Sequence, residues 1–300
     1  MMTKNNFLPS LLGCLLLVFT ACGNDDDDNI PAEDRNDNQN NTSVCREASR
    51  LEFPHLKGGN SIPIVHRTAD GAVNYSVEWD IDLKSQRWSC YTLDKASLTA
   101  RTSRYYGNPQ YPLDPDLPIR YYLDRPSADY SIGDYFYSSG FDHGHICPSA
   151  DRLYSAEANY QTFYLTNMQP QYNEFNAKLW AVMEDQVRTW ARASATETLY
   201  VCKGGTIDKA EHRLLPIKNT LLVPRYFFMA LLLKNEQGYR ALAFWAENEN
   251  RDRSNDNLSK YAISIDELEQ RTGIDFFCNL PDMTEKMVEK NLALNAWGLR

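Results

Sequence analysis

Residues 141–152 read Phe-Asp-His-Gly-His-Ile-Cys-Pro-Ser-Ala-Asp-Arg and place two of the five histidines of the chain two positions apart. An unperturbed histidine has a pKa of about 6.5, so His143 and His145 are both able to accept a proton near neutral pH. Gly144 between them lets the backbone approach a ligand closely. His143, His145 and Cys147 also alternate as on one face of a strand. A metal site is therefore an alternative, although no fourth ligand is evident. The stretch therefore indicates a site for proton transfer.

A second polar segment, Thr-Asn-Met-Gln-Pro-Gln at residues 166–171, precedes a helix that we predict over residues 173–193. Four residues of this helix are spaced by four: Asn176, Trp180, Glu184 and Arg188. Such spacing forms one slowly drifting stripe on a helix, where polar groups are costly to bury unpaired. An asparagine amide oxygen also suits Mg²⁺, which prefers oxygen ligands and retains several waters. The alternative is a solvated helix face with a Glu184–Arg188 pair.

Together, the two segments resemble the DNA/RNA non-specific endonucleases of the ββα-metal type. That family carries Asp-Arg-Gly-His, then Thr-Asn-x-x-Pro-Gln, and then a helix with an Asn, a Trp and a Glu. The corresponding residues here are Asp142-His143-Gly144-His145, residues 166–171, and Asn176, Trp180 and Glu184. The similarity continues in the order of the family from Tyr75 to Glu289, so it covers most of the chain.

The resemblance implies a Mg²⁺-dependent hydrolysis of phosphodiester bonds in DNA and RNA, with Mn²⁺ as an expected substitute. It makes His145 the general base for the attacking water and Asn176 the sole direct protein ligand of one Mg²⁺. Glu184 would orient water on the ion, while Arg104 and Arg188 would stabilise negative charge on the phosphate. The division is chemically consistent, because hydrolysis needs a nucleophile and neutralisation of the developing charge.

His143 departs from the family pattern, which has arginine at this position. Unlike arginine, an unperturbed histidine is largely neutral at pH 7. We expect weaker substrate binding or a lower pH optimum; the alternatives are that Arg104 or Arg152 supplies the missing charge, or that the enzyme is degenerate. His143, Asn167 and Arg152 are the expected substrate contacts. The alternative function is a non-catalytic nucleic-acid-binding surface lipoprotein on the same fold, although such a protein needs no general base.

Secondary-structure patterns predict an α+β fold. Runs rich in aromatic and β-branched residues predict strands at residues 75–81, 87–93, 199–202, 220–233 and 241–245. Further helices are expected from Ser264, where Ser-x-x-Glu forms a capping box, and over residues 284–297. Strands mingle with helices without a strict βαβ alternation. This order favours a mixed, largely antiparallel central sheet flanked by helices.

The N-terminus predicts export as a lipoprotein. Residues 1–21 hold Lys4 and then the apolar run 11–19, which is too short to span a bilayer and is typical of a signal peptide. Small residues directly before Cys22 resemble a lipobox, so we expect Cys22 to be acylated and the protein to be anchored in the outer membrane; a signal peptide without lipidation is the alternative. The acidic run 25–28 resembles a surface-export signal or is simply a solvated tether.

Composition divides the remaining chain into a tether and one domain. Residues 22–44 are rich in Asn, Asp and Thr, so they predict a disordered acidic tether, followed by an endonuclease domain over residues 45–300. The chain has 31 basic and 40 acidic residues, a net charge of −9, of which residues 1–44 hold −5. Residues 45–300 therefore carry a net charge of −4 and lack the basic footprint usual for non-specific nucleic-acid binders. This charge argues against tight, processive binding to nucleic acid.

Residues outside the two motifs are assigned to structure. Three histidines are expected at the surface or in packing: His55, His66 and His212. An oxidising compartment would favour one or two disulfides, with at least one free thiol, among five cysteines: Cys45, Cys90, Cys147, Cys202 and Cys278. The spacing of these cysteines does not determine which of them pair.

Overall fold

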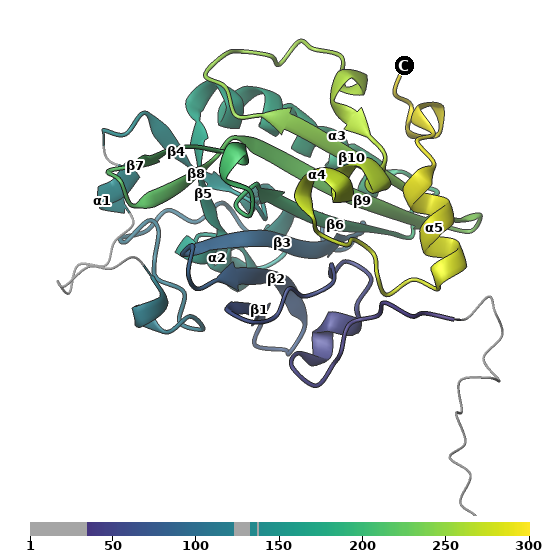
Figure 1. Ribbon diagram of the computed structural model, residues 1–300, viewed down its shortest axis with the longest axis horizontal. Coiled ribbons are helices and arrows are strands. Elements are labelled where there is room, and N and C mark those ends of the chain that lie inside the picture. Colours follow the sequence, from purple (N-terminus) through teal and green to yellow (C-terminus); the bar gives the residue numbers. More distant parts are fainter. Residues whose placement is uncertain (1–34, 123–132, 137) are drawn as a thin grey trace, which may run out of the picture. The chain divides into compact units, whose positions relative to one another are not determined.

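The computed structural model of the protein describes residues 35–122, 133–136 and 138–300 (Figure 1). The predicted signal peptide, Cys22 and the acidic run lie outside the described residues. Among the described helices, none combines the length and the apolar character that a membrane crossing requires.

A seven-stranded sheet forms the centre of the described part of the chain (Figure 1). Its strands lie in the order β1-β2-β3-β6-β9-β10-β11, and each neighbouring pair is antiparallel. The strands are β1 (Ser61–Arg67), β2 (Val73–Asp80), β3 (Ser85–Leu93), β6 (Thr198–Gly205), β9 (Tyr226–Asn235), β10 (Gly238–Glu247) and β11 (Ala262–Ile263). The predicted α+β fold with a largely antiparallel sheet is confirmed.

Both faces of the sheet are buried, which is why its central strands are continuously hydrophobic. Successive side chains of a strand point to opposite faces, and β9 divides its residues between two core clusters in this way. One cluster contains Met183 and Val187 of α3 (Ala181–Arg192). The other contains residues of α4 (Ile265–Thr272) and α5 (Asp282–Lys290). The helices therefore cover both faces of the sheet, with α3 on one side and α4 and α5 on the other (Figure 1).

Smaller elements surround this core. Strand β4 (Phe141–His145) pairs with β5 (Met168–Tyr172), and β7 (Arg213–Ile217) pairs with β8 (Leu221–Pro224). Two short helices are α1 (Gly133–Phe136) and α2 (Ala156–Gln161).

Two predicted elements are divided in the structure. The strand predicted over residues 220–233 contains β8 and most of β9, with a bend at Arg225 directly after Pro224. Proline has no N–H to donate to a sheet, so it suits the end of β8. The helix predicted over residues 284–297 is α5 followed by a separate 3₁₀ turn, Leu294–Trp297.

The N-terminal segment, residues 35–44, packs against the C-terminal part of the domain. The Asn36 side chain donates hydrogen bonds to the carbonyl oxygens of Cys278 and Leu280, at 2.9 and 2.7 Å. Asn40 is buried, and its amide nitrogen donates hydrogen bonds to the carbonyl oxygens of Ala48 and Pro54. Composition predicted a disordered tether here, but the asparagine amides satisfy backbone carbonyls that water would otherwise bind. The folded domain therefore starts before the predicted boundary.

The five cysteines that follow residue 44 are buried free thiols, so the predicted disulfides are wrong. Cys90 of β3 and Cys202 of β6 lie opposite each other in adjacent strands. Burial raises the pKa of both thiols well above the ordinary value. Because the thiolate is the reactive form, burial keeps these side chains inert.

Candidate active site

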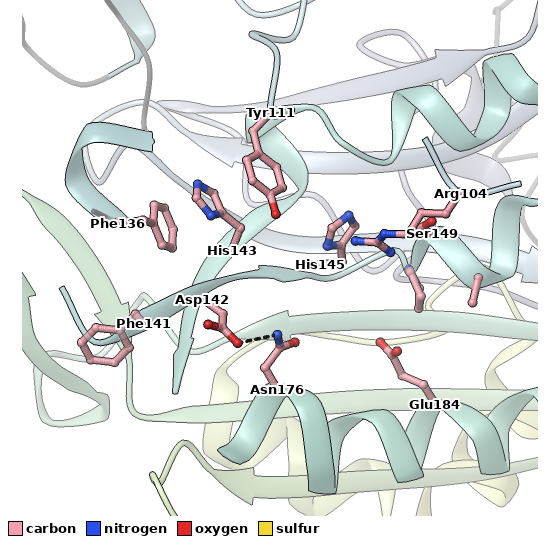
Figure 2. A pocket seen from close by; sticks show the side chains of 12 residues that line it. Arg104, Tyr111, Phe136, Phe141, Asp142, His143, His145, Ser149, Asn176 and Glu184 are labelled. Carbon is pink, nitrogen blue, oxygen red and sulfur yellow. Dashed lines mark hydrogen bonds between the residues drawn. The ribbon is translucent and has the colours of Figure 1, made fainter. Parts of the chain in front are cut away.

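Strands β4 and β5 and the helix that follows them form a compact ββα unit. β4 and β5 are antiparallel, with His145 opposite Met168. A π-helical segment, Phe175–Trp180, then continues directly into α3. Side chains from the strand and the helix line one cavity of about 520 Å³ (Figure 2).

Five of the residues predicted for the site line this cavity: Arg104, His143, His145, Asn176 and Glu184. Figure 2 shows Asn176 and Glu184 rising from the helix toward His145, with Arg104 beside the histidine. The remaining lining residues are Tyr111, Phe136, Phe141, Asp142, Pro148, Ser149 and Ala150. The fold therefore brings together residues that lie as far apart in the sequence as Arg104 and Glu184.

The ring of His145, which lines this cavity, is neutral at pH 7. Its Nε2 atom is buried and has no hydrogen-bond partner among the described residues. Burial and then the charge of Arg104 lower the pKa of His145 to about 3, against a backbone hydrogen bond with His143 that acts in the opposite direction. A neutral imidazole with a free nitrogen can accept a proton at neutral pH.

His143 lies in an aromatic stack. Its ring is parallel to Tyr111 at a centroid distance of 3.7 Å and to Phe136 at 3.9 Å (Figure 2). Burial lowers the pKa of His143 to about 4, although Asp142 acts to raise it. His143 is therefore neutral at pH 7 and does not replace the charge of the arginine that the family pattern has. Of the two arginines considered as substitutes, Arg104 lines the cavity.

Asn176 is held by a hydrogen bond at its amide nitrogen. Asn176 Nδ2 donates to Asp142 Oδ2 at 3.0 Å, and Asn173 Nδ2 donates to the same oxygen at 3.0 Å. The contact turns the amide oxygen of Asn176 into the cavity, on the side of Glu184 (Figure 2). Asp142 thus fixes the orientation of the side chain that was predicted to bind the metal.

The helix does not present the predicted four-residue stripe as one face. Asn176 and Glu184 line the cavity, whereas Trp180 between them is buried in the main core, at 1% exposure. The π-helical segment accounts for the difference, because its hydrogen bonds join residues five apart and rotate Asn176 relative to the α-helical register.

Glu184 has a buried partner that the sequence reasoning missed. Lys203 Nζ on β6 donates to Glu184 Oε1 at 2.7 Å, and Lys203 is only 1% exposed. Burial raises the pKa of Glu184 above the ordinary value, while the charge of Lys203 lowers it. The sequence contained a signal for this pair, namely a lysine inside the largely apolar run 199–205. A lysine is rarely fully buried unless it is paired.

Three residues predicted for the site do not line the cavity. Their side chains form ion pairs or hydrogen bonds with other parts of the protein. Arg188 pairs with Asp151, with Nη1 and Oδ1 2.7 Å apart. Asn167 is fully buried and exchanges two hydrogen bonds of 2.8 Å with the backbone of Cys147. Arg152 is 1% exposed and donates to backbone carbonyl oxygens. All three help to hold the loop after β4 in place.

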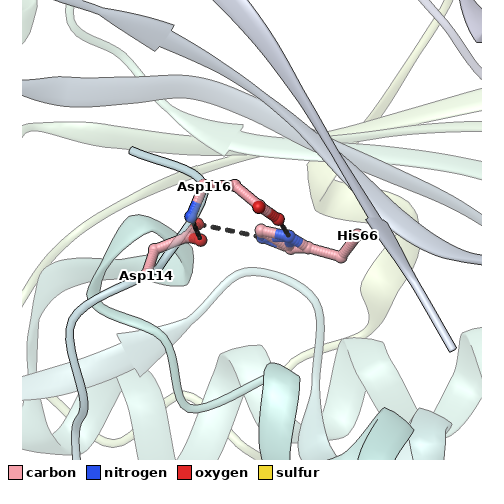
Figure 3. A group of neighbouring side chains, drawn as sticks. All are labelled: His66, Asp114 and Asp116. Atoms are coloured by element: carbon pink, nitrogen blue, oxygen red, sulfur yellow. Dashed lines mark hydrogen bonds and ion pairs between the residues drawn. The ribbon is translucent and has the colours of Figure 1, made fainter. Parts of the chain in front are cut away.

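A second His/Asp group lies outside the cavity lining. His66, Asp114 and Asp116 offer ligand atoms close enough to hold a metal ion (Figure 3). However, His66 Nε2 lies 3.0 Å from Asp114 Oδ2, which also accepts a hydrogen bond from Thr166 Oγ1 at 2.5 Å. Burial lowers the pKa of His66 to about 4. We interpret the group as a buried tie between β1 and the Thr166 segment, which agrees with the structural role predicted for His66.

The cavity itself suits a hard divalent cation. The amide oxygen of Asn176 and the carboxylate of Glu184 both face it, and oxygen donors are what Mg²⁺ prefers. The hydrogen bond from Asn176 to Asp142 leaves that amide oxygen oriented for a ligand. Asn176 would hold the ion directly, and the volume leaves room for the waters that Mg²⁺ retains.

A ββα unit with a neutral histidine on its strand and an oriented asparagine on its helix defines a site of the ββα-metal type. The sequence model of the DNA/RNA non-specific endonucleases matches residues 59–283, which is three quarters of the chain. The protein belongs to this family.

Individual relatives agree with the family match. A protein named Nuclease from Nostoc sp. (strain PCC 7120) is 31% identical over 188 residues, which cover 60% of this chain and 63% of the relative. Nuclease C1 from Cunninghamella echinulata var. echinulata is 30% identical over 175 residues, covering 56% and 66%. These alignments thus span just under two thirds of both relatives.

A solved structure shares the fold. A chain in the crystal structure of the EndoG/EndoGI complex superposes with a TM-score of 0.57 at 19% identity. The match covers 74% of this chain and 89% of that chain.

Proposed function

We propose that the protein is a Mg²⁺-dependent endonuclease that hydrolyses phosphodiester bonds of DNA and RNA with little sequence preference. One observation carries the proposal: His145, whose Nε2 has no hydrogen-bond partner among the described residues, lines the same cavity as Asn176 and Glu184, whose side-chain oxygens face it. Family membership supports it, as do relatives whose printed names are Nuclease and Nuclease C1.

Each side chain has one task in the reaction. His145 takes a proton from the attacking water at Nε2, which is neutral and unpartnered. As the oxygen of that water bonds to phosphorus, the bond between phosphorus and the leaving oxygen breaks, and a second water in the cavity protonates the leaving oxygen. Asn176 would hold the ion through its amide oxygen, which the hydrogen bond to Asp142 orients. Glu184 accepts hydrogen bonds from water in the cavity. When bound, a divalent cation supplies a Lewis acid for a phosphate oxygen. Arg104 stabilises the charge that develops on the phosphate.

A degradation assay tests this function. The fragment 32–300, which retains the docked N-terminal segment, is incubated with plasmid DNA and with RNA between pH 5 and 8, in Mg²⁺ or in EDTA. We expect both nucleic acids to be degraded in Mg²⁺ and neither in EDTA. Degradation in EDTA would contradict the metal dependence. Binding without degradation at every pH would instead support the non-catalytic binding protein.

Replacing Lys203 by methionine should move the acid side of the activity profile to higher pH. Lys203 holds a positive charge 2.7 Å from Glu184 and thereby lowers the pKa of that carboxyl group. Without the charge of Lys203, the effect of burial is unopposed and the pKa of Glu184 is higher. The carboxyl group then stays protonated to a higher pH, and its protonated oxygen donates a hydrogen bond where the carboxylate would accept one. We expect a shift of about one pH unit or more in kcat against pH.

Lys203→Arg is the matched variant, because it keeps the charge, and its profile should stay near that of the wild type. Breaking a buried pair also costs about 3–5 kcal/mol of stability, so the Tm of each variant is measured alongside. If Lys203→Met lowers the rate equally at all pH values, Lys203 only supports the fold.

We further propose that the protein is exported and anchored to the outer membrane through a lipid on Cys22, with nucleic acid outside the cell as substrate. Support comes from the apolar run 11–19 and the small residues before Cys22. Replacing Cys22 by serine should release the protein from the membrane fraction; an unchanged distribution would contradict the anchor.

A further inference from the structure

Five carboxylates gather where α4, α5 and the loop between them meet the N-terminal segment; we call them the α4–α5 acidic cluster. Its members are Asp266, Glu269, Asp275, Glu285 and Glu289. They form two groups of three that share Glu289, and within each group the carboxylate oxygens lie within 4.8 Å of one another. In the described chain, no lysine or arginine forms an ion pair with any of the five. None of the five lines the active-site cavity.

Glu289 is the unusual member of the cluster. It is 7% exposed, and its buried Oε1 atom has no hydrogen-bond partner in the described part of the chain. A buried polar atom without a partner costs free energy, and a carboxylate costs more than a neutral group. The position of Glu289 therefore requires a partner for its oxygen, either a proton or a cation.

An asparagine supplies a further oxygen at the same place. Asn38 Nδ2 donates to Asp275 Oδ2 at 3.1 Å and to Glu285 Oε1 at 3.0 Å. Its Oδ1 is buried and also lacks a partner among the described residues. A half-turn of the amide would present this oxygen to the same point between the two carboxylates. With the amide turned in this way, the N-terminal segment, the α4–α5 loop and α5 would each supply an oxygen ligand atom.

We propose that Asp275, Glu285 and Glu289 bind one Ca²⁺ ion, with the amide oxygen of Asn38 as a further ligand. Ca²⁺ takes six to eight oxygen ligands from carboxylates, amides and water in a flexible geometry, which suits this donor set. Mg²⁺ fits less well, because it demands a near-octahedral arrangement and gives up water reluctantly. Binding here would join the N-terminal segment to α5 and the loop, so the ion is structural and separate from the metal of the cavity.

Protonation of the carboxylates would also relieve the repulsion between them, and it competes with binding of a cation. Burial first, and then the neighbouring carboxylates, raise the pKa of Glu289 to about 9. Burial likewise raises the pKa of Glu285 to about 7. A cluster that keeps its protons would bind no ion, and this outcome is distinguishable by direct measurement of bound Ca²⁺.

Equilibrium dialysis with radioactive Ca²⁺ at pH 8 tests the site, using the full chain with Asn176→Ala so that the cavity cannot contribute its own ligand. We expect about one Ca²⁺ per chain, and a rise in Tm of about 5 °C at a Ca²⁺ concentration about 100-fold above the dissociation constant. The same concentration of Mg²⁺ should give a smaller shift. Glu289→Gln, which keeps the side-chain volume, should abolish both the bound ion and the Ca²⁺-dependent shift.

Glu236→Gln is the matched control, because Glu236 is an exposed carboxylate in the turn between β9 and β10 and should not affect binding. Asp275→Asn is the second test variant and should weaken binding at least tenfold. The proposal is overturned if the chain with Asn176→Ala retains no Ca²⁺, or if Glu289→Gln and Asp275→Asn both bind it as tightly as their parent. Neither readout depends on nuclease activity.

Discussion

Replacing His145 by alanine is expected to slow phosphodiester hydrolysis by about 10²–10⁴-fold, the contribution typical of a positioned general base. His145 lines the cavity, its Nε2 has no hydrogen-bond partner among the described residues, and burial keeps the ring neutral. The variant keeps Asn176 and Glu184, so binding of Mg²⁺ should persist. Initial rates on plasmid DNA and on RNA at saturating Mg²⁺ measure the loss.

Two comparisons separate a lost base from a damaged fold. His55→Ala removes an exposed histidine outside the cavity and should leave the rate unchanged. Added imidazole should restore part of the activity of His145→Ala, because the enlarged cavity can admit it. A loss below about tenfold, with an unchanged Tm, would mean that another group takes the proton.

Replacing Asn176 by alanine should cost about 10²-fold or more in rate at limiting Mg²⁺, because the direct protein ligand of the ion is removed. The expected signature is a rise in the Mg²⁺ concentration that gives half-maximal activity. A Mg²⁺ titration of the initial rate measures it. A drop in maximal rate with an unchanged half-maximal concentration would contradict the assignment of Asn176 as the ligand.

Asn173→Ala is the matched control for this prediction. Asn173 and Asn176 both donate to Asp142 Oδ2 at 3.0 Å, but only Asn176 lines the cavity. Each alanine variant therefore removes one hydrogen bond from the same carboxylate, whereas only Asn176→Ala removes the cavity oxygen. Equal losses in the two variants would show that the restraint on Asp142 matters, and not the amide oxygen of Asn176.

The structure also changes what the histidine at position 143 means. Loss of the arginine that the family has there suggested a site short of one positive charge. In the fold, His143 is a neutral ring between Tyr111 and Phe136, so it contributes packing on the wall of the cavity. Among the described residues that line the cavity, Arg104 is the cationic side chain. The proposed chemistry therefore relies on one arginine together with the metal ion.

Three predicted site residues that the structure places in the cavity belong to locally determined structure. His145 follows from a short strand, and Asn176 and Glu184 follow from one helix, so their separation along the chain fixes most of their separation in space. Even here, local reasoning had a limit. The stripe predicted from α-helical spacing failed at Trp180, because a π-helical segment changes the rotation per residue.

What the sequence determined by itself was the family pattern, the α+β class and the candidate base and metal ligand, because each depends on spacing within a strand or a helix. Only the tertiary structure decided that Lys203 supports Glu184, that Asn167 and Arg152 hold a loop, and that residues 35–44 join the domain. These outcomes depend on which distant segments meet and on which polar atoms they bury. Residue type alone does not reveal whether a charged or amide side chain will face solvent, substrate or a partner inside the protein.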